Sequence, residues 1–122
     1  MRDEIYWIVT ASVEPQSYDA VVAMLAPLVE ATRQEPGSNA YDYSINADHT
    51  VVHIFESYRD SEALVAHVQD TFSQFAAEFT ALLSIDGFVV YGWPDPAAKE
   101  ILDGFGSVYM TPFIGYTQSD GG

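Results

Sequence analysis

The sequence predicts an α+β domain built around a small sheet. Runs of β-branched and aromatic residues alternate with stretches whose apolar residues recur at helical spacing. These segments follow the order strand, helix, strand, strand, helix, strand, which is the ferredoxin-like split β-α-β arrangement. The chain has 122 residues, 48% of them hydrophobic, which is enough for one domain with a core.

The first strand is predicted at residues 5–13, IYWIVTASV. Both of its alternating faces are largely apolar, so we expect it to be covered on both sides. Residues 15–17 break the strand, and a helix follows to about Gln34, where Pro36-Gly37 end it. Pro27 inside this helix predicts a kink or an offset.

The remaining elements are predicted from the same two patterns, alternation of side chains in strands and helical spacing of apolar residues. They are strands at residues 39–46, 50–58 and 85–93 and helical segments at about residues 61–68 and 71–83. The first two of these strands are expected to form an antiparallel hairpin, because the residues between them are turn-like. Asp60 or Ser61 is expected to cap the helix that follows the hairpin.

The chain is expected to divide into two parts. Residues 1–93 form the ferredoxin-like domain, and residues 94–122 add a C-terminal helix from about Pro96 and an extended arm. The arm is aromatic and apolar over Tyr109–Tyr116. We expect it to pack on the same domain, over a pocket mouth, or on a dimer partner. Residues 119–122 are expected to be disordered.

The charge of the chain limits its partners. Eighteen acidic and four basic residues give a net charge of −14. This balance argues against nucleic acid and membrane surfaces, which require clusters of Lys and Arg. It is typical of a solvated acidic surface, or of a patch for a basic partner.

Cysteine and apolar content limit the chemistry and the location. No cysteine is present, which excludes disulfides and thiolate chemistry. No apolar stretch approaches the ~20 residues of a membrane span, and the N-terminus lacks a hydrophobic signal core. A cytoplasmic location is therefore expected. The motifs of nucleotide binding, zinc proteolysis and nucleophile-elbow hydrolysis are also absent from the sequence.

His67 is the first candidate for chemistry. It shares a helix stripe with Ala63 and Leu64 that is expected to face the sheet. An imidazole there can act as a general base or orient a bound phenol, because its ordinary pKa is near neutrality. A hydrogen-bonded core histidine is the alternative.

Glu56 is the second candidate, because a carboxylate inside an apolar strand is costly to bury unless it is paired. Its natural partners are His67, whose tautomer it could hold, and Arg59. A structural ion pair at a dimer interface is the alternative. His53 lies on the opposite face of the same strand, so only one of the two can face the helices, and the sequence does not decide which. His49 and His53 lack a third ligand nearby, so no metal site is expected.

Aromatic side chains could enclose a flat phenolic ligand. The candidate ligand-binding residues are Trp7, Asn39, Tyr41, His53, Tyr58, Phe72, Tyr91 and Trp93. Tyr43, Phe75 and Phe79 belong to the same aromatic set, and the last two are the strongest candidates for plain core residues. The alternative for each of these aromatics is a purely structural role.

Three motifs resemble the antibiotic biosynthesis monooxygenase family over roughly residues 5–93. They are EPG at residues 35–37, FESY at residues 55–58 and DSEALVAH at residues 60–67. The resemblance implies a dimeric α/β barrel in which two copies pair through their sheets. It also implies chemistry without a cofactor, with a histidine at the place of His67 lining the pocket.

The leading function implied by this resemblance is a cofactor-independent monooxygenase that uses dioxygen on a small hydroquinone-like or anthrone-like aromatic. His67 would be the base and Glu56 would orient it. The alternatives are a non-catalytic barrel that binds a small aromatic ligand, a haem-binding protein and a muconolactone-type isomerase. The family's anthrone oxygenases use an Asn and a Trp near the pocket, and its haem-degrading members use an Asn on the first strand. The third strand here has neither residue, and the first strand has no Asn.

Overall fold

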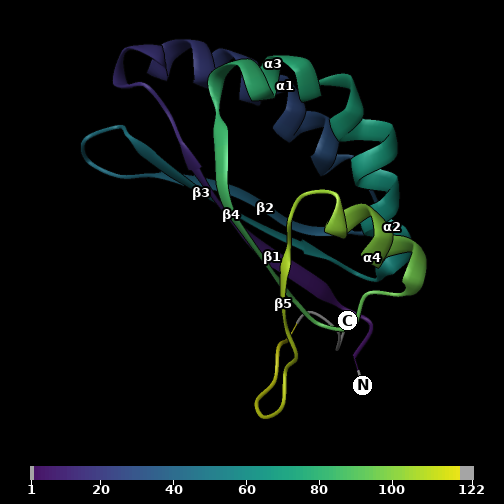
Figure 1. The fold of residues 1–122 in the computed structure, drawn as a ribbon. Helices are drawn as coiled ribbons and strands as arrows, with labels where there is room; N and C mark the ends of the chain where they lie inside the picture. Colours follow the sequence, from purple (N-terminus) through teal and green to yellow (C-terminus); the bar gives the residue numbers. More distant parts are fainter. Residues whose placement is uncertain (1, 119–122) are drawn as a thin grey trace.

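The computed structural model describes residues 2–118, and its centre is a five-stranded sheet with the order β2-β3-β1-β4-β5. The strands are β1 (Ile5–Ser12), β2 (Ser38–Ile45), β3 (Val51–Tyr58), β4 (Ser84–Tyr91) and β5 (Val108–Met110). Neighbouring strands are antiparallel, except β4 and β5, which are parallel. Within the described residues, all helices lie on one side of the sheet (Figure 1).

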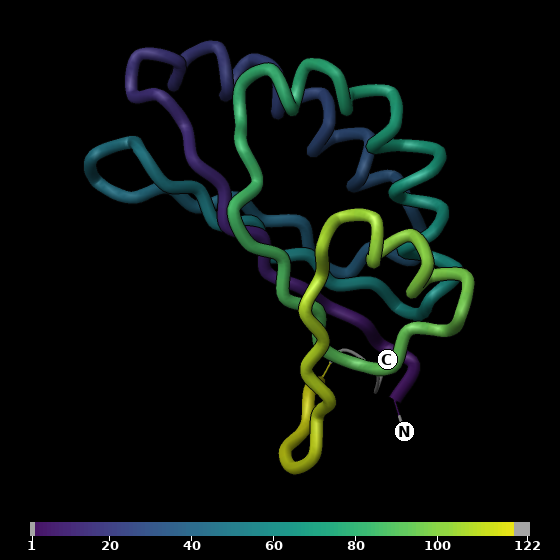
Figure 2. The backbone as a smooth tube through the Cα atoms, in the orientation of Figure 1, coloured from purple at the N-terminus to yellow at the C-terminus, as the bar shows by residue number. Residues whose placement is uncertain are grey.

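The helical segments confirm the predicted α+β, ferredoxin-like order. They are α1 (Tyr18–Arg33), α2 (Ser61–Ala66), α3 (Ala76–Leu82) and α4 (Pro96–Asp103), the 3-10 turns η1 (Pro15–Ser17) and η3 (Phe72–Gln74), and the π-helical turn η2 (His67–Thr71). α1 continues through Pro27. Asp60 caps α2, since its Oδ1 accepts a hydrogen bond from the Ala63 amide at 2.9 Å. The chain runs from α2 to α3 through the turns η2 and η3 (Figure 2).

The core lies between the helices and one face of the sheet. On β1 the buried side chains are those of Ile5, Trp7, Val9 and Ala11, and on β3 the buried side chains that share this face are those of Val52, Ile54, Glu56 and Tyr58. Because side chains alternate along a strand, this pattern decides the orientation that the sequence leaves open. Glu56 faces the helices, and His53 is exposed on the opposite face.

Within residues 2–118, no helix covers the second face of the sheet (Figure 1). Tyr6 lies at its centre, stacked on Tyr91 at 5.0 Å between ring centroids and 6.1 Å from the ring of Phe55. Phe55 is 40% exposed. The helices therefore cover one of the two faces of β1 that the sequence predicts to be buried.

The C-terminal part of the described chain has a packed and an exposed section. α4 packs on α2 and buries Ala98 and Leu102. After β5 the chain leaves the sheet edge and turns back (Figure 2), and Phe113, Ile114 and Tyr116 are exposed. The four residues predicted to be disordered, 119–122, lie outside the described part. No helix within residues 2–118 has the length and apolar character needed to cross a bilayer.

Gly37 brings the segment after α1 into close contact with α2. A Cβ atom at Gly37 would lie 2.5 Å from the Cβ atom of Ala63, a distance that no real pair of side chains tolerates. The Arg59 amide donates to the Gly37 carbonyl at 2.8 Å. Only a glycine permits this approach, which lies two residues after Glu35.

Gly37→Ala is expected to lower the free energy of unfolding by about 1–3 kcal/mol, because the added methyl group overpacks the contact with Ala63. Chemical denaturation measures the change. Gly87→Ala is the matched control, since a Cβ atom there would meet only Thr10 at 3.7 Å, an ordinary contact. Equal stability of the two variants would contradict the steric argument.

Candidate functional site

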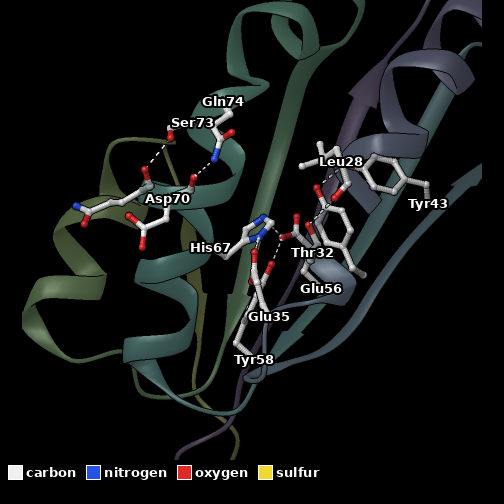
Figure 3. A network of polar contacts seen from close by, with 12 residues as sticks. Leu28, Thr32, Glu35, Tyr43, Glu56, Tyr58, His67, Asp70, Ser73 and Gln74 are labelled. Atoms are coloured by element: carbon white, nitrogen blue, oxygen red, sulfur yellow. Dashed lines mark hydrogen bonds and ion pairs between the residues drawn. The ribbon is translucent and has the colours of Figure 1, made fainter. Parts of the chain in front are cut away.

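His67 lies between two carboxylates beneath the helices. Its Nδ1 atom is 2.9 Å from Oε2 of Glu35, and its Nε2 atom is 3.6 Å from Oε1 of Glu56 (Figure 3). The three side chains are 2%, 16% and 8% exposed, respectively. Because ionisable groups are costly to bury unless they are paired, these residues stabilise one another as a unit.

Three distant segments supply the members of this cluster. Glu35 follows α1 and stands directly before Pro36. Glu56 is on the helix-facing side of β3, and His67 is the first residue of the π-helical turn η2. π-helical turns are rare and occur frequently at functional sites. The cluster therefore forms only when the helices have packed on the sheet.

Glu35 is placed to orient His67, a role that was predicted for Glu56. A carboxylate can only accept hydrogen bonds, so Nδ1 of His67 donates to Glu35. In the neutral form of the imidazole, the lone pair is then on the other ring nitrogen, Nε2. Arg59, the alternative partner predicted for Glu56, pairs with Asp60 at 3.5 Å instead.

Glu56 is surrounded by polar groups that partly offset its burial. The Tyr58 hydroxyl donates to its Oε1 atom at 2.7 Å. Burial raises the pKa of the Glu56 carboxyl, while His67, Tyr58 and Trp7 each lower it. The Trp7 indole favours the charged carboxylate, although Nε1 has no acceptor at hydrogen-bonding distance. Glu56 thus takes up a proton more readily than an exposed glutamate, as a proton-transfer group requires.

An apolar pocket opens beside His67 and Glu56. It is lined by Trp7, Val9, Tyr41, Tyr43, Ile54, Glu56, His67, Val68, Phe72, Phe79, Ile85, Phe88 and Phe105. Its empty volume, counted out to the open mouth, is about 380 Å³, but the space wide enough for a water molecule is a small part of this. The pocket is therefore a narrow slot with hydroxyl, carboxyl and imidazole groups on an apolar wall.

The structure brings five predicted site residues to this pocket. They are Trp7, Tyr41, Glu56, His67 and Phe72. Tyr58 is completely buried behind Glu56, and its ring lies 5.2 Å from the imidazole of His67. Tyr58 therefore contacts Glu56 and His67 without lining the pocket.

Four predicted ligand-binding residues lie elsewhere. The pairing of β2 with β3 shifts between Ser38 and Ala40, so Asn39 leaves the regular alternation and is exposed. Strand alternation turns His53 and Tyr91 to the second face of the sheet. Trp93 lies beyond the end of β4, in a groove formed with residues of the C-terminal arm.

Glu35 is a site residue that was not predicted from the sequence. Its only signal is the EPG motif, where it stands directly before the Pro36-Gly37 helix stop. Phe88 and Phe105, whose rings stack at 5.3 Å between centroids, also line the pocket without having been predicted. Within the described residues, no group of three or more acidic or histidine side chains is arranged to hold a metal ion.

The family model described as antibiotic biosynthesis monooxygenase matches residues 5–78. The chain belongs to this family. The match begins at β1 and ends within α3, so it contains Glu35, Glu56 and His67. A comparison with curated proteins gives no match.

Solved structures share the fold of this family member. MupZ from Pseudomonas fluorescens is 23% identical, with a TM-score of 0.84 over 96% of this chain and 91% of that one. Rv0793 from Mycobacterium tuberculosis is 27% identical, with a TM-score of 0.63 over 77% and 98% of the two chains. A putative antibiotic biosynthesis monooxygenase from Nitrosomonas europaea is 22% identical, with a TM-score of 0.66 over 79% and 95%. Only the first of these three extends over nearly the whole chain.

Glu35→Ala is expected to lower the free energy of unfolding by about 1–3 kcal/mol, because it leaves Nδ1 of the buried His67 without an acceptor. Urea denaturation measures the loss. Glu30→Ala is the matched control, since Glu30 pairs with Arg33 in an exposed contact that contributes at most about 1 kcal/mol. A Glu35 variant as stable as this control would show that the bond to His67 contributes little.

Glu56→Gln is expected to change how stability depends on pH. A carboxyl whose pKa in the folded state is raised contributes stability below its unfolded pKa, and this stability is lost as pH rises through the folded pKa. Wild type should therefore lose stability relative to Glu56→Gln as pH rises above the ordinary value of 4.5. Unfolding at a series of pH values measures the difference, with Glu30→Gln as the control. A difference that does not vary with pH would contradict the raised pKa.

Proposed function

We propose that this protein is a cofactor-independent monooxygenase of a small hydroquinone-like aromatic. The observation that carries the proposal is His67, held between two carboxylates on the wall of an apolar aromatic pocket. Membership of the antibiotic biosynthesis monooxygenase family supports the same reaction class. A dry pocket with a positioned base suits a reaction that needs deprotonation, orientation and exclusion of water.

The proposed reaction begins with removal of a phenolic proton by Nε2 of His67. Glu35 holds the tautomer that leaves this nitrogen free, and Glu56 can receive the proton in turn. The electron-rich phenolate then reduces dioxygen, and a ring carbon forms a bond to oxygen as a hydroperoxide. Loss of water from the hydroperoxide gives a hydroxyquinone. One hydroquinone and one dioxygen thus yield one hydroxyquinone and one water.

The width of the pocket favours a single-ring substrate. Because little of the pocket is wide enough for water, any ring must displace lining side chains such as Phe72 or Phe105. Side-chain rotations of this kind are common on binding. A three-ring anthrone needs a larger displacement, so we propose hydroquinone-like over anthrone-like substrates.

A muconolactone-type isomerase is the second candidate. An imidazole with a carboxylate at each ring nitrogen can remove a proton from one atom of a ligand and return it to another. Such a reaction needs the same base but no dioxygen. The two candidates therefore differ in oxygen consumption and not in the dependence on His67.

We further propose that two copies pair through the second face of the sheet, at Tyr6, Phe55 and Tyr91. A partly exposed aromatic cluster on an uncovered sheet is suited to a partner copy, and obligate interfaces of this kind are large and apolar. The helix-covered pocket lies on the opposite side of the sheet.

His67→Ala is expected to lower oxygen uptake with hydroquinones by about a hundredfold or more, the contribution of a general base. An oxygen electrode measures uptake above the autoxidation of the substrate alone. His49→Asn is the matched control, because His49 lies in the β2–β3 turn with a φ of 58°, a conformation that Asn tolerates.

The outcomes separate the candidates. Uptake by His67→Ala within a few-fold of wild type would remove the base assignment. If folded wild type takes up no oxygen, the monooxygenase proposal is wrong. Conversion of the ligand without oxygen would then favour the isomerase. Binding without conversion would favour a non-catalytic barrel.

A further inference from the structure

Tyr41 and Tyr43 share a hydrogen bond on the wall of the pocket. Their hydroxyl oxygens are 2.8 Å apart, and their rings meet nearly edge to face, with centroids 5.3 Å apart at 81°. Both side chains line the pocket from β2. Two hydroxyls carry two donor protons, and the bond between them uses only one.

The second donor of this pair has no protein acceptor among residues 2–118, because neither hydroxyl makes a further hydrogen bond there. Burial raises the pKa of Tyr41 and of Tyr43, and the charge of Glu56 raises both further. Both hydroxyls thus stay protonated and remain donors. Both side chains are part-buried, and an O–H group that loses water without gaining an acceptor is costly, so an oxygen atom of a ligand that fills the pocket would be the acceptor for this second donor.

The hydroxyl pair is adjacent to the proposed base. Tyr41 pairs directly with Glu56 across the β2–β3 ladder, and its ring centroid is 5.1 Å from that of the His67 imidazole. A small ring in the pocket can therefore present an oxygen atom to the two hydroxyls while it lies within reach of His67.

Charge balance at the site also permits an anionic oxygen beside Glu56. A proton taken from a phenol by His67 can pass to Glu56, whose Oε1 atom is 3.6 Å from Nε2. The negative charge on the ligand then replaces the charge of the carboxylate and does not add to it. Linked hydroxyls also polarise one another, which strengthens their bond to an anion.

We propose that Tyr41 and Tyr43 form an oxygen-binding subsite that selects phenols and stabilises the phenolate oxygen of the bound ring. This inference rests on the proposed function, because it assigns the substrate class of the same pocket. It adds two substrate-contacting residues to the proposed reaction and predicts that a ring without a hydroxyl group binds more weakly.

The test compares the binding of 4-nitrophenol and 4-nitrotoluene, which differ by a hydroxyl and a methyl group of similar size. Calorimetry gives both affinities, and absorbance shows whether bound 4-nitrophenol is a phenolate. Wild type should prefer 4-nitrophenol and bind it as the phenolate. Tyr43→Phe leaves the Tyr41 hydroxyl free to donate and should weaken 4-nitrophenol binding less than removal of both hydroxyls, which should cost about tenfold, as expected for one hydrogen bond to a charged group, with 4-nitrotoluene nearly unchanged.

The double variant Tyr41→Phe/Tyr43→Phe should lose the preference altogether. Tyr18→Phe is the matched control, because Tyr18 lies at the start of α1 with its ring on His49, outside the pocket, and should affect neither ligand. Equal weakening of both ligands would show a packing role only. An unchanged preference in the double variant, or no saturable binding by wild type, would overturn the subsite.

These measurements require no dioxygen, so they separate the two proposals. A preference for 4-nitrophenol that depends on the tyrosines, in a protein that consumes no oxygen, would support the proposed subsite and contradict the proposed monooxygenase activity. Oxygen uptake that is unchanged in the double variant would support the proposed monooxygenase activity and contradict the proposed subsite.

Discussion

The site depends on the burial of one imidazole between two carboxylates. An isolated ionisable group in this core would be costly, and the arrangement persists because each member of the cluster satisfies another. Glu35 occupies one nitrogen of His67, and Glu56 lies near the other. The Tyr58 hydroxyl then satisfies Glu56 from behind. The contacts that hold the helices on the sheet are thus also the contacts that position the groups of the site.

The sheet provides the second constraint, because its register aligns the pocket wall. Tyr41 on β2, Glu56 on β3 and Trp7 on β1 are successive partners in the ladders, and all three point toward the helices. The π-helical turn then places His67 over this row. A base from the helical layer and acidic and aromatic groups from the sheet therefore meet in one narrow slot.

Most of the fold could be predicted from the sequence, because strand alternation, helical spacing and the Pro36-Gly37 stop are local signals. The meeting of Glu56 with His67 was also predictable, since a lone carboxylate in an apolar strand requires a partner. Glu35 was not, because its contact with His67 spans 32 residues and depends on how closely two helices approach. The position of Asn39 outside the pocket was not predictable either, since the irregularity in the β2–β3 ladder has no clear sequence signal.

The shared row of Tyr41, Glu56 and Trp7 has a consequence for how such proteins diverge. A deletion or insertion of one residue within β2 or β3 would shift the register of the strand beyond the change, turn those side chains to the other face and disrupt the wall. Replacements at single positions of the row leave its geometry intact. New specificities on this scaffold should therefore arise by substitution within the row, while changes in length should accumulate in the β2–β3 turn and in the chain beyond β5, which do not line the pocket.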